Sequence, residues 1–283
     1  MATSQWTLLD GATEGDQRSL SVAGGQLVAY SCRAPDKDTD NEDAVAVIPY
    51  GDDAAVLVVA DGAGGLPGGR RASQTAVTEL ARSLAESRVE SALVRTAVLN
   101  GIEAANRAVL DLGTGAATTL TVVAVEGRTA RTFQIGDSEA LIVGNRGLIR
   151  AQTMAHSPTG FAVEAGFLGE REALHHEERH LVSNFMGTSD MRIDMGAVVD
   201  MQARDTIMVA SDGVTDNIHV HEVVDIIRKG PLPKAIDALI RLATHRMNSD
   251  ASSQPSKPDD LSVILFRKPP VRRRAGANGG GPQ

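Results

Sequence analysis

Short apolar runs rich in valine alternate along the chain with longer segments of helical periodicity. A run of four to eight apolar residues between turn signals is typical of a strand, and apolar residues three and four positions apart are typical of a helix. The pattern predicts strands at 26–31, 44–48, 54–60, 119–125, 130–135, 140–143, 206–210 and 261–266, with a further edge at 148–150. It predicts two helices within 70–112, separated by a break near 87–91, and helices at 170–174, 220–229 and 233–248.

The links between predicted strands are short, which favours antiparallel pairing over crossover connections. Gly51-Asp52-Asp53 separates two valine-rich runs and predicts a hairpin. Pairs of helices alternate with groups of strands, which is typical of sheets covered by helices on their outer faces. The weakly periodic segment 151–186 is interpreted as an excursion that covers part of the molecule.

Composition narrows the class of protein. The 283 residues are 42% hydrophobic and 23% charged, which fits one large globular domain and excludes wholesale disorder, although both ends look unstructured. A formal net charge of -8 makes nucleic acid an unexpected partner. The single cysteine, Cys32, excludes an intrachain disulfide and a thiolate zinc cluster, and it fits a cytoplasmic setting. Neither a membrane-spanning apolar stretch nor a secretory signal is present, so no membrane association is expected.

Acidic residues fall at the ends of the predicted strands. Three aspartates stand just after a strand, and two acidic pairs stand just before one; they are Asp61, Asp137 and Asp212, then Glu42 with Asp43 and Asp259 with Asp260. Strand ends hold side chains rigidly and can converge on one point, where carboxylate oxygens suit Mg²⁺ or Mn²⁺. An aspartate after a strand is also a common turn former, and for any one position this alternative stands. For all of these acidic residues together, the interpretation as turn formers is much weaker.

In their order along the chain, these motifs resemble those of the protein phosphatase 2C, or metal-dependent protein phosphatase, family of bacterial type. The matching segments are Asn41-Glu42-Asp43, the glycine-rich 58–65, Gly69 with Ala72-Ser73, Thr118-Thr119, Gly136-Asp137-Ser138, 210–216 and 259–263. The resemblance spans about 26–267. His156-Ser157 and 176–187 resemble the family's flap more loosely.

The resemblance implies an α+β fold, a four-layer α/β/β/α sandwich of two antiparallel sheets flanked by helices. It also implies the domain organisation: an N-terminal extension at 1–20, a phosphatase-like domain at 21–268 with a flap at about 151–186, and a disordered tail at 269–283.

The resemblance further implies a metal site that holds two, and up to three, Mn²⁺ or Mg²⁺ ions. Asp61, Asp212 and Asp259 would ligate one ion, and Asp61 with the Gly62 carbonyl would hold the second. Glu42 and Asp43 would bind the second ion's waters, and Asp137 with Asp212 would offer a weaker third site. Catalysis is assigned to Asp61, Asp212 and Asp43.

The implied activity is hydrolysis of phosphoserine and phosphothreonine on protein substrates. Two such cations lower the pKa of a shared water, which then attacks the phosphoryl group directly. The protein is expected to act as a monomer against phosphorylated proteins, opposing a bacterial Ser/Thr kinase.

Two positions depart from the family. Bacterial relatives usually carry a phosphate-binding arginine five residues before the aspartate of the first acidic motif, where this chain has Asp38. Lys37 or Arg33 is predicted to contact the substrate phosphate instead, although lysine lacks the bidentate fork. A histidine proposed as proton donor is replaced by Ala63 and Leu66. General acid catalysis contributes about 10²- to 10⁴-fold, so slow turnover of serine phosphates is expected.

The departures leave one alternative of another class, a catalytically weakened phosphatase fold that serves as a regulatory binding module. The retained aspartates oppose it, because a purely structural domain gains nothing from crowded carboxylates. A nucleotide-binding loop at 62–69, a transition-metal site at His175, His176 and His180, and a serine nucleophile at Ser211 each lack the accompanying residues that such sites need.

Overall fold

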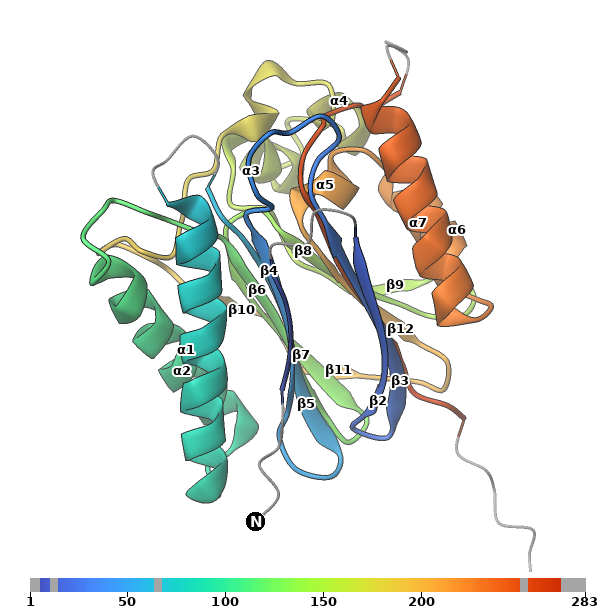
Figure 1. The fold of residues 1–283 in the computed structure, drawn as a ribbon. Coiled ribbons are helices and arrows are strands. Elements are labelled where there is room, and N and C mark those ends of the chain that lie inside the picture. Colours follow the sequence, from blue (N-terminus) through green and yellow to red (C-terminus); the bar gives the residue numbers. More distant parts are fainter. Residues whose placement is uncertain (1–5, 11–14, 64–67, 250–253, 271–283) are drawn as a thin grey trace, which may run out of the picture.

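Two antiparallel sheets pack face to face in the computed structural model, and a pair of helices covers the outer face of each sheet (Figure 1). The structure describes residues 6–10, 15–63, 68–249 and 254–270. This arrangement confirms the predicted α+β sandwich of four layers. The strands are antiparallel throughout the described sheets, as the short links between them predicted.

The first sheet has seven strands, in the order β1-β4-β5-β6-β7-β10, with β11 also pairing with β7. They are β1 (Thr7–Asp10), β4 (Asp43–Pro49), β5 (Ala54–Asp61), β6 (Leu120–Glu126), β7 (Thr129–Ile135), β10 (Asp194–Met195) and β11 (Val199–Asp200). Val56 and Val58 of β5 face the helices, while Leu57 and Val59 face the other sheet. Both faces of this strand are therefore buried, which explains why its sequence has no polar alternation.

The second sheet has six strands, in the order β2-β3-β13-β12-β8-β9. They are β2 (Asp16–Val22), β3 (Gly25–Cys32), β8 (Glu139–Val143), β9 (Ile149–Gln152), β12 (Thr206–Ala210) and β13 (Leu261–Arg267). The last of the described strands, β13, lies between β3 and β12 in the interior of the sheet. Side chains from both sheets form one apolar layer between them, including Leu27, Val45 and Ile264.

Helices α1 (Gly69–Val89) and α2 (Val94–Leu110) cover the first sheet, and α6 (Val220–Ile227) and α7 (Leu232–Met247) cover the second. In α1, Ala72, Ala76, Leu80 and Leu84 are fully buried. This spacing places them on one face of the helix, as the periodicity predicted. The break predicted near 87–91 is confirmed by the end of α1 and the start of α2.

Short helices occupy the segments between β9 and β13. They are α3 (Pro158–Glu164), α4 (Glu170–Ala173), the 3₁₀ helix η1 (Glu177–His180) and α5 (Asp212–Thr215). Of these, only the helix near 170–174 was predicted. In the described part of the chain, no helix is long and apolar enough to cross a membrane.

The expectation that the amino-terminal end lacks structure is wrong for β1 and β2. Strand β1 pairs with β4 in the first sheet, and β2 pairs with β3 in the second. Three consecutive residues of β2, Gln17 to Ser19, are polar and exposed and do not alternate between buried and exposed positions. Polar, exposed residues are common in edge strands. The predicted tail lies outside the described residues from 271 onward.

Candidate active site

The hairpin of β4 and β5 brings the first two acidic motifs together. Asp43 and Asp61 are register partners across these strands. At the end of β5, the N–H of Thr119 donates to the Asp61 carbonyl at 2.8 Å, and the hydroxyl of Thr118 donates to the same oxygen at 2.7 Å. A Cβ on Gly62 would lie 2.4 Å from the Gly69 backbone, so only glycine fits this turn.

The second sheet delivers the remaining aspartates to the same end of the sandwich. Ala210, at the end of β12, is the register partner of Glu139 in β8 and of Val263 in β13. Asp212 follows β12, while Asp137 and Asp259 precede β8 and β13. In an antiparallel pair, the end of one strand lies beside the start of its neighbour, so all three aspartates lie at the same end of these strands.

Asp61 lies at the centre of the gathered carboxylates. Burial raises its pKa well above the usual range of an aspartate, and the charges of Asp43, Asp212, Asp259 and Asp137 raise it further. Five of the aspartates that the sequence grouped are therefore close enough to repel one another. The structure does not place them on separate faces of the molecule.

Two carboxylate oxygens in this group are buried and have neither a hydrogen bond nor an ion pair among the described residues. Asp43 is fully buried; its Oδ2 accepts a hydrogen bond from Ser211 at 2.8 Å, but its Oδ1 has none. Burial, followed by the charge of Asp260, raises the pKa of Asp43. Asp212 is 7% exposed, and its Oδ1 also lacks a partner. An unpartnered buried carboxylate oxygen is costly unless a cation completes it.

One side of the group contains a lysine. The ammonium of Lys257 contacts Asp212 Oδ2, lies 2.9 Å from Asp216 Oδ2 and lies 3.3 Å from Asp259 Oδ2. Burial and then the charge of Asp212 raise the pKa of Asp216 to about 6 and that of Asp259 to about 7, although Lys257 opposes both shifts. Asp137, on the same side, has its pKa raised by burial and by Asp212.

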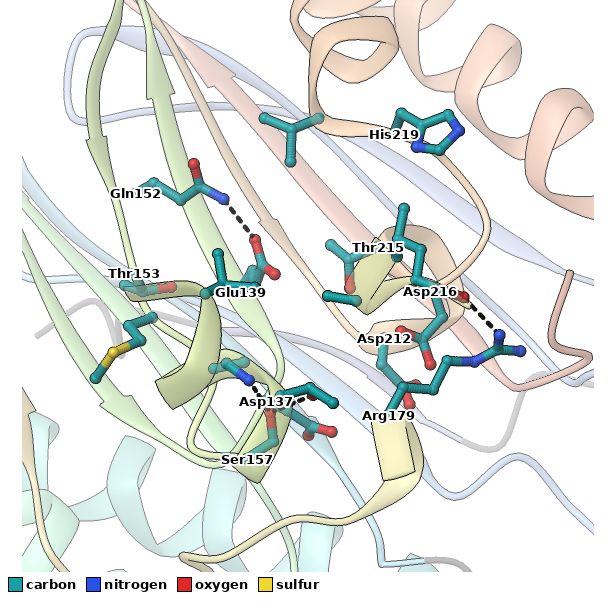
Figure 2. A pocket seen from close by; sticks show the side chains of 18 of the residues that line it. Asp137, Glu139, Gln152, Thr153, Ser157, Arg179, Asp212, Thr215, Asp216 and His219 are labelled. Carbon is teal, nitrogen blue, oxygen red and sulfur yellow. Dashed lines mark hydrogen bonds between the residues drawn. The ribbon is translucent and has the colours of Figure 1, made fainter. Parts of the chain in front are cut away.

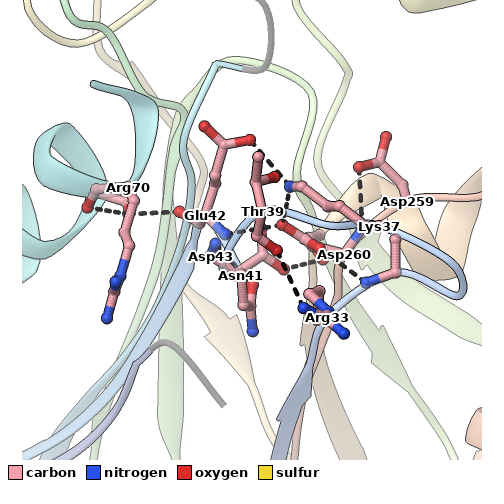
Figure 3. A network of polar contacts seen from close by, with 12 residues as sticks. Arg33, Lys37, Thr39, Asn41, Glu42, Asp43, Arg70, Asp259 and Asp260 are labelled. Atoms are coloured by element: carbon pink, nitrogen blue, oxygen red, sulfur yellow. Dashed lines mark hydrogen bonds and ion pairs between the residues drawn. The ribbon is translucent and has the colours of Figure 1, made fainter. Parts of the chain in front are cut away.

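The other side contains a second lysine, shown in Figure 3. Lys37 Nζ donates to Asp260 Oδ2 at 2.6 Å and to Glu42 Oε2 at 2.9 Å. Asp260 also accepts the N–H groups of Ala34 at 2.8 Å and Glu42 at 2.7 Å. Arg33 has one long contact, 3.5 Å from its Nη1 to the Thr39 carbonyl.

A pocket of about 290 Å³ adjoins the aspartates. Asp137, Asp212 and Asp216 line this pocket; in Figure 2, Ser157 lies beside Asp137, and Arg179 lies beside Asp216. Many of the other lining residues belong to the segment predicted to be a flap. The pocket is wide enough for a side chain and opens beside the acidic group, as a substrate site would.

His156 holds the turn that carries Asp137. Its Nδ1 accepts the N–H of Gly136 at 3.2 Å, and its Nε2 lies 3.0 Å from Asp194 Oδ2. The ring is 3% exposed. His156 therefore fixes the position of the acidic turn from outside the site, and the sequence grouped it only with the flap.

The donor set suits hard divalent cations. The gathered groups are carboxylates, and the two orphaned oxygens, Asp43 Oδ1 and Asp212 Oδ1, are of the kind that Mg²⁺ and Mn²⁺ prefer. Among the described residues, no three histidine, cysteine, aspartate or glutamate side chains form a preassembled metal-ligand group. The residues therefore fit a divalent ion in chemistry and in location, without being closed around one.

Sequence reasoning missed two residues of the site. Asp216 stands in the matched segment 210–216 but received no role, and Lys257 was not singled out. Asp216 could have been found from its place one helical turn after Asp212. A lone lysine in a polar loop gives no such signal.

The fold and the acidic group define a phosphatase built on a two-sheet sandwich, and comparisons with known proteins agree. The Protein phosphatase 2C family matches residues 33–251. Protein phosphatase PhpP of Streptococcus pneumoniae serotype 2 is 30% identical over 222 residues, which cover 74% of this chain and 87% of that protein.

Solved structures show the same architecture. The serine/threonine phosphatase of S. agalactiae superposes with a TM-score of 0.71 at 25% identity, covering 89% of this chain and 99% of that one. The catalytic domain of serine threonine protein phosphatase PstP, solved in complex with two manganese ions, gives a TM-score of 0.66 at 21% identity over 86% and 97% of the two chains. The chain belongs to the protein phosphatase 2C family, and its enzyme class is protein phosphatase.

Proposed function

We propose that this protein hydrolyses phosphoserine and phosphothreonine esters on protein substrates, with two Mn²⁺ or Mg²⁺ ions as cofactors. The observation that carries the proposal is the position of Asp61, whose pKa is raised by burial and by four surrounding aspartates. Such crowding is unfavourable without cations. The two manganese ions in the PstP structure support the choice of metal.

The roles proposed for individual residues are those that the family resemblance implies. Asp61, Asp212 and Asp259 would hold one ion, and Asp61 with the Gly62 carbonyl would hold the second. Asp43 and Glu42 would orient water on the second ion, and Asp137 extends the group toward the pocket. When bound, such a pair of cations lowers the pKa of a water and stabilises charge on the phosphoryl oxygens.

Arg33 is the less engaged of the two predicted phosphate contacts. The ammonium of Lys37 is already paired with Glu42 and Asp260, whereas the guanidinium of Arg33 makes only one long contact within the part of the chain that the structure describes. A guanidinium binds phosphate with two parallel N–H donors. We therefore assign phosphate binding to Arg33 and a structural role to Lys37.

Position 63, one of the two where the family's proton-donating histidine was considered, is alanine in this chain, so no histidine there can protonate the leaving group. Leu66, the other position considered, lies outside the described residues. Nitrophenolate leaves without protonation, while a serine alkoxide does not. Nitrophenyl phosphate should therefore be hydrolysed faster than a phosphoserine peptide.

Phosphorylated proteins are the substrate class that the named relatives support. A cognate kinase, the monomeric state and the cytoplasmic location stay predictions. The alternative, a weakened phosphatase fold that acts only by binding, is favoured by no observation in the described structure.

Manganese-dependent hydrolysis of nitrophenyl phosphate and of a phosphothreonine peptide tests the proposal. Metal catalysis contributes several kcal/mol, so Asp61→Asn and Asp212→Asn should each lower kcat/KM by about 10³-fold or more. Asp225→Asn, on the exposed face of α6, is the matched control and should leave activity unchanged. Equal activity in EDTA, or retained activity in both site variants, would contradict the proposed function.

A further inference from the structure

The loop before β13 holds the backbone of Lys257 close to the aspartates. Asn217 binds this backbone on both sides: its Oδ1 accepts the Lys257 N–H at 2.8 Å, and its Nδ2 donates to the Lys257 carbonyl at 2.8 Å. Asn217 is fully buried. The neighbouring carbonyl of Ser256 accepts a hydrogen bond from Arg179 at 2.9 Å. The lysine side chain therefore extends from a defined point of the loop.

The ammonium of Lys257 lies on carboxylates that the proposed function assigns to one ion. This ion, the first ion, is assigned to Asp61, Asp212 and Asp259. The ammonium contacts Asp212 Oδ2 and lies 3.3 Å from Asp259 Oδ2. Its third partner is Asp216 Oδ2, at 2.9 Å, and Asp216 has no assigned role in metal binding. The lysine and the first ion therefore have two carboxylates in common.

The oxygen that Asp259 can offer to a cation already faces the lysine. Asp259 Oδ1 accepts the N–H of Asp260 at 2.9 Å, so Oδ2 is the oxygen that stays available to a cation. Oδ2 is also the oxygen that faces the ammonium. An ion held jointly by Asp212 and Asp259 would therefore need the space in which the ammonium lies.

The two cations also oppose one another by charge. An ammonium and a divalent ion on the same pair of carboxylates repel strongly, because the lysine side chain is only 21% exposed and water screens the site poorly. Asp212 Oδ1, which is buried and has no partner among the described residues, can accept an ion while the lysine stays in place. Coordination by Asp259 requires the ammonium to move, and Asp216 remains as its partner.

We propose that the ammonium of Lys257 occupies the place of the first divalent ion and must leave Asp212 and Asp259 before that ion can bind fully. The inference rests on the proposed function, because it assumes a divalent metal centre at these aspartates. Lys257 thereby sets the concentration of Mn²⁺ or Mg²⁺ at which the metal centre fills.

Metal affinity tests the inference without relying on activity. The wild-type protein, Lys257→Met and Lys257→Arg are titrated with Mn²⁺, and free manganese is measured by electron paramagnetic resonance. One dissociation constant for Mn²⁺ should be at least about tenfold lower in Lys257→Met than in the wild type, because no charge has to be displaced. Lys257→Arg keeps the charge and should bind no more tightly than the wild type. Lys234→Met, at an exposed lysine of α7, is the matched control and should bind as the wild type does.

The outcomes separate the two proposals. Equal or weaker binding of Mn²⁺ by Lys257→Met would overturn the role of Lys257 and leave the proposed function intact. Tighter binding by both Lys257→Met and Lys257→Arg would also overturn it, since the charge would then not be the cause. No bound manganese in any of these proteins would overturn the proposed function, and the role of Lys257 with it.

A crystal structure of the wild type grown with saturating Mn²⁺ covers the case of a variant that folds poorly. An ion is expected between Asp212 and Asp259, with the Lys257 ammonium moved away from both and still paired with Asp216. An ion in that position, with the ammonium still within hydrogen-bond distance of Asp212 and Asp259, would overturn the inference.

Discussion

Two lysines lie at the same end of the sandwich, each among carboxylates and almost equally exposed, Lys37 at 22% and Lys257 at 21%. Around Lys37, both oxygens of Asp260 are occupied by the lysine and two backbone N–H groups. Around Lys257, Asp212 keeps a buried oxygen without a partner. A carboxylate whose two oxygens both accept hydrogen bonds can hold loops together. A carboxylate with one oxygen that accepts no hydrogen bond can still bind a cation.

Replacing the fully occupied carboxylate should give the largest effect on stability. Asp260→Ala leaves the ammonium of Lys37 and two N–H groups without their acceptor, so the free energy of unfolding should fall by about 3 to 5 kcal/mol. Urea unfolding in EDTA measures it. Asp190→Ala, at an exposed aspartate, is the control and should change the value by less than about 0.5 kcal/mol. A loss below about 1 kcal/mol for Asp260→Ala would show that the Lys37 group does not hold the loops.

The carboxylates around Lys257, which are Asp212, Asp216 and Asp259, should make the metal-free protein less stable as pH rises. Asp216 and Asp259 have pKa values of about 6 and about 7, against 3.8 without the fold. Between these values the folded chain binds more protons than the unfolded chain, so stability present at pH 4 is lost as pH approaches 7. We expect a loss of about 2 kcal/mol, mostly from Asp216, since Asp259 is one third exposed.

Urea unfolding in EDTA at several pH values gives this slope, and Asp216→Asn should flatten it. Saturating Mn²⁺ should remove the slope as well, because a bound ion favours the charged carboxylates. A metal-free stability that rises between pH 5 and pH 7 would mean that the aspartates are not crowded as the structure places them.

The smallest expected effect separates the two predicted phosphate contacts. Arg33→Met should raise KM for a phosphothreonine peptide about tenfold, the loss of roughly 1.4 kcal/mol of binding, with kcat changed less. Lys37→Met should leave KM within about twofold and instead lower the free energy of unfolding by about 1 kcal/mol. Steady-state kinetics and urea unfolding on both variants decide the matter, and the reverse pattern would return phosphate binding to Lys37.

The sequence was informative where burial and turn chemistry agree. The hairpin of β4 and β5 was predicted because its valine-rich strands are buried on both faces and flank a glycine turn. Strand β2 was missed because it lies at a sheet edge, where its polar residues meet solvent and leave no apolar pattern.

The residues of the candidate active site also fall into those that the sequence predicted and those that it missed. The aspartates could be predicted because each stands at a strand end within a recognisable motif. Whether a carboxylate is occupied, as Asp260 is, or left with a free oxygen, as Asp212 is, depends on partners more than forty residues away along the chain. No local pattern carries such information, and Lys257 went unnoticed for this reason.

The place of β13 affects how the protein is made on the ribosome. This strand is the last of the described strands, yet it lies inside the second sheet and pairs with β3 across more than two hundred residues of sequence. The second sheet cannot close during synthesis until 261–267 have left the exit tunnel, and contacts so distant in sequence form slowly. Asp259 arrives with that strand, so a nascent chain released early would lack both the sheet interior and one ligand of the metal centre.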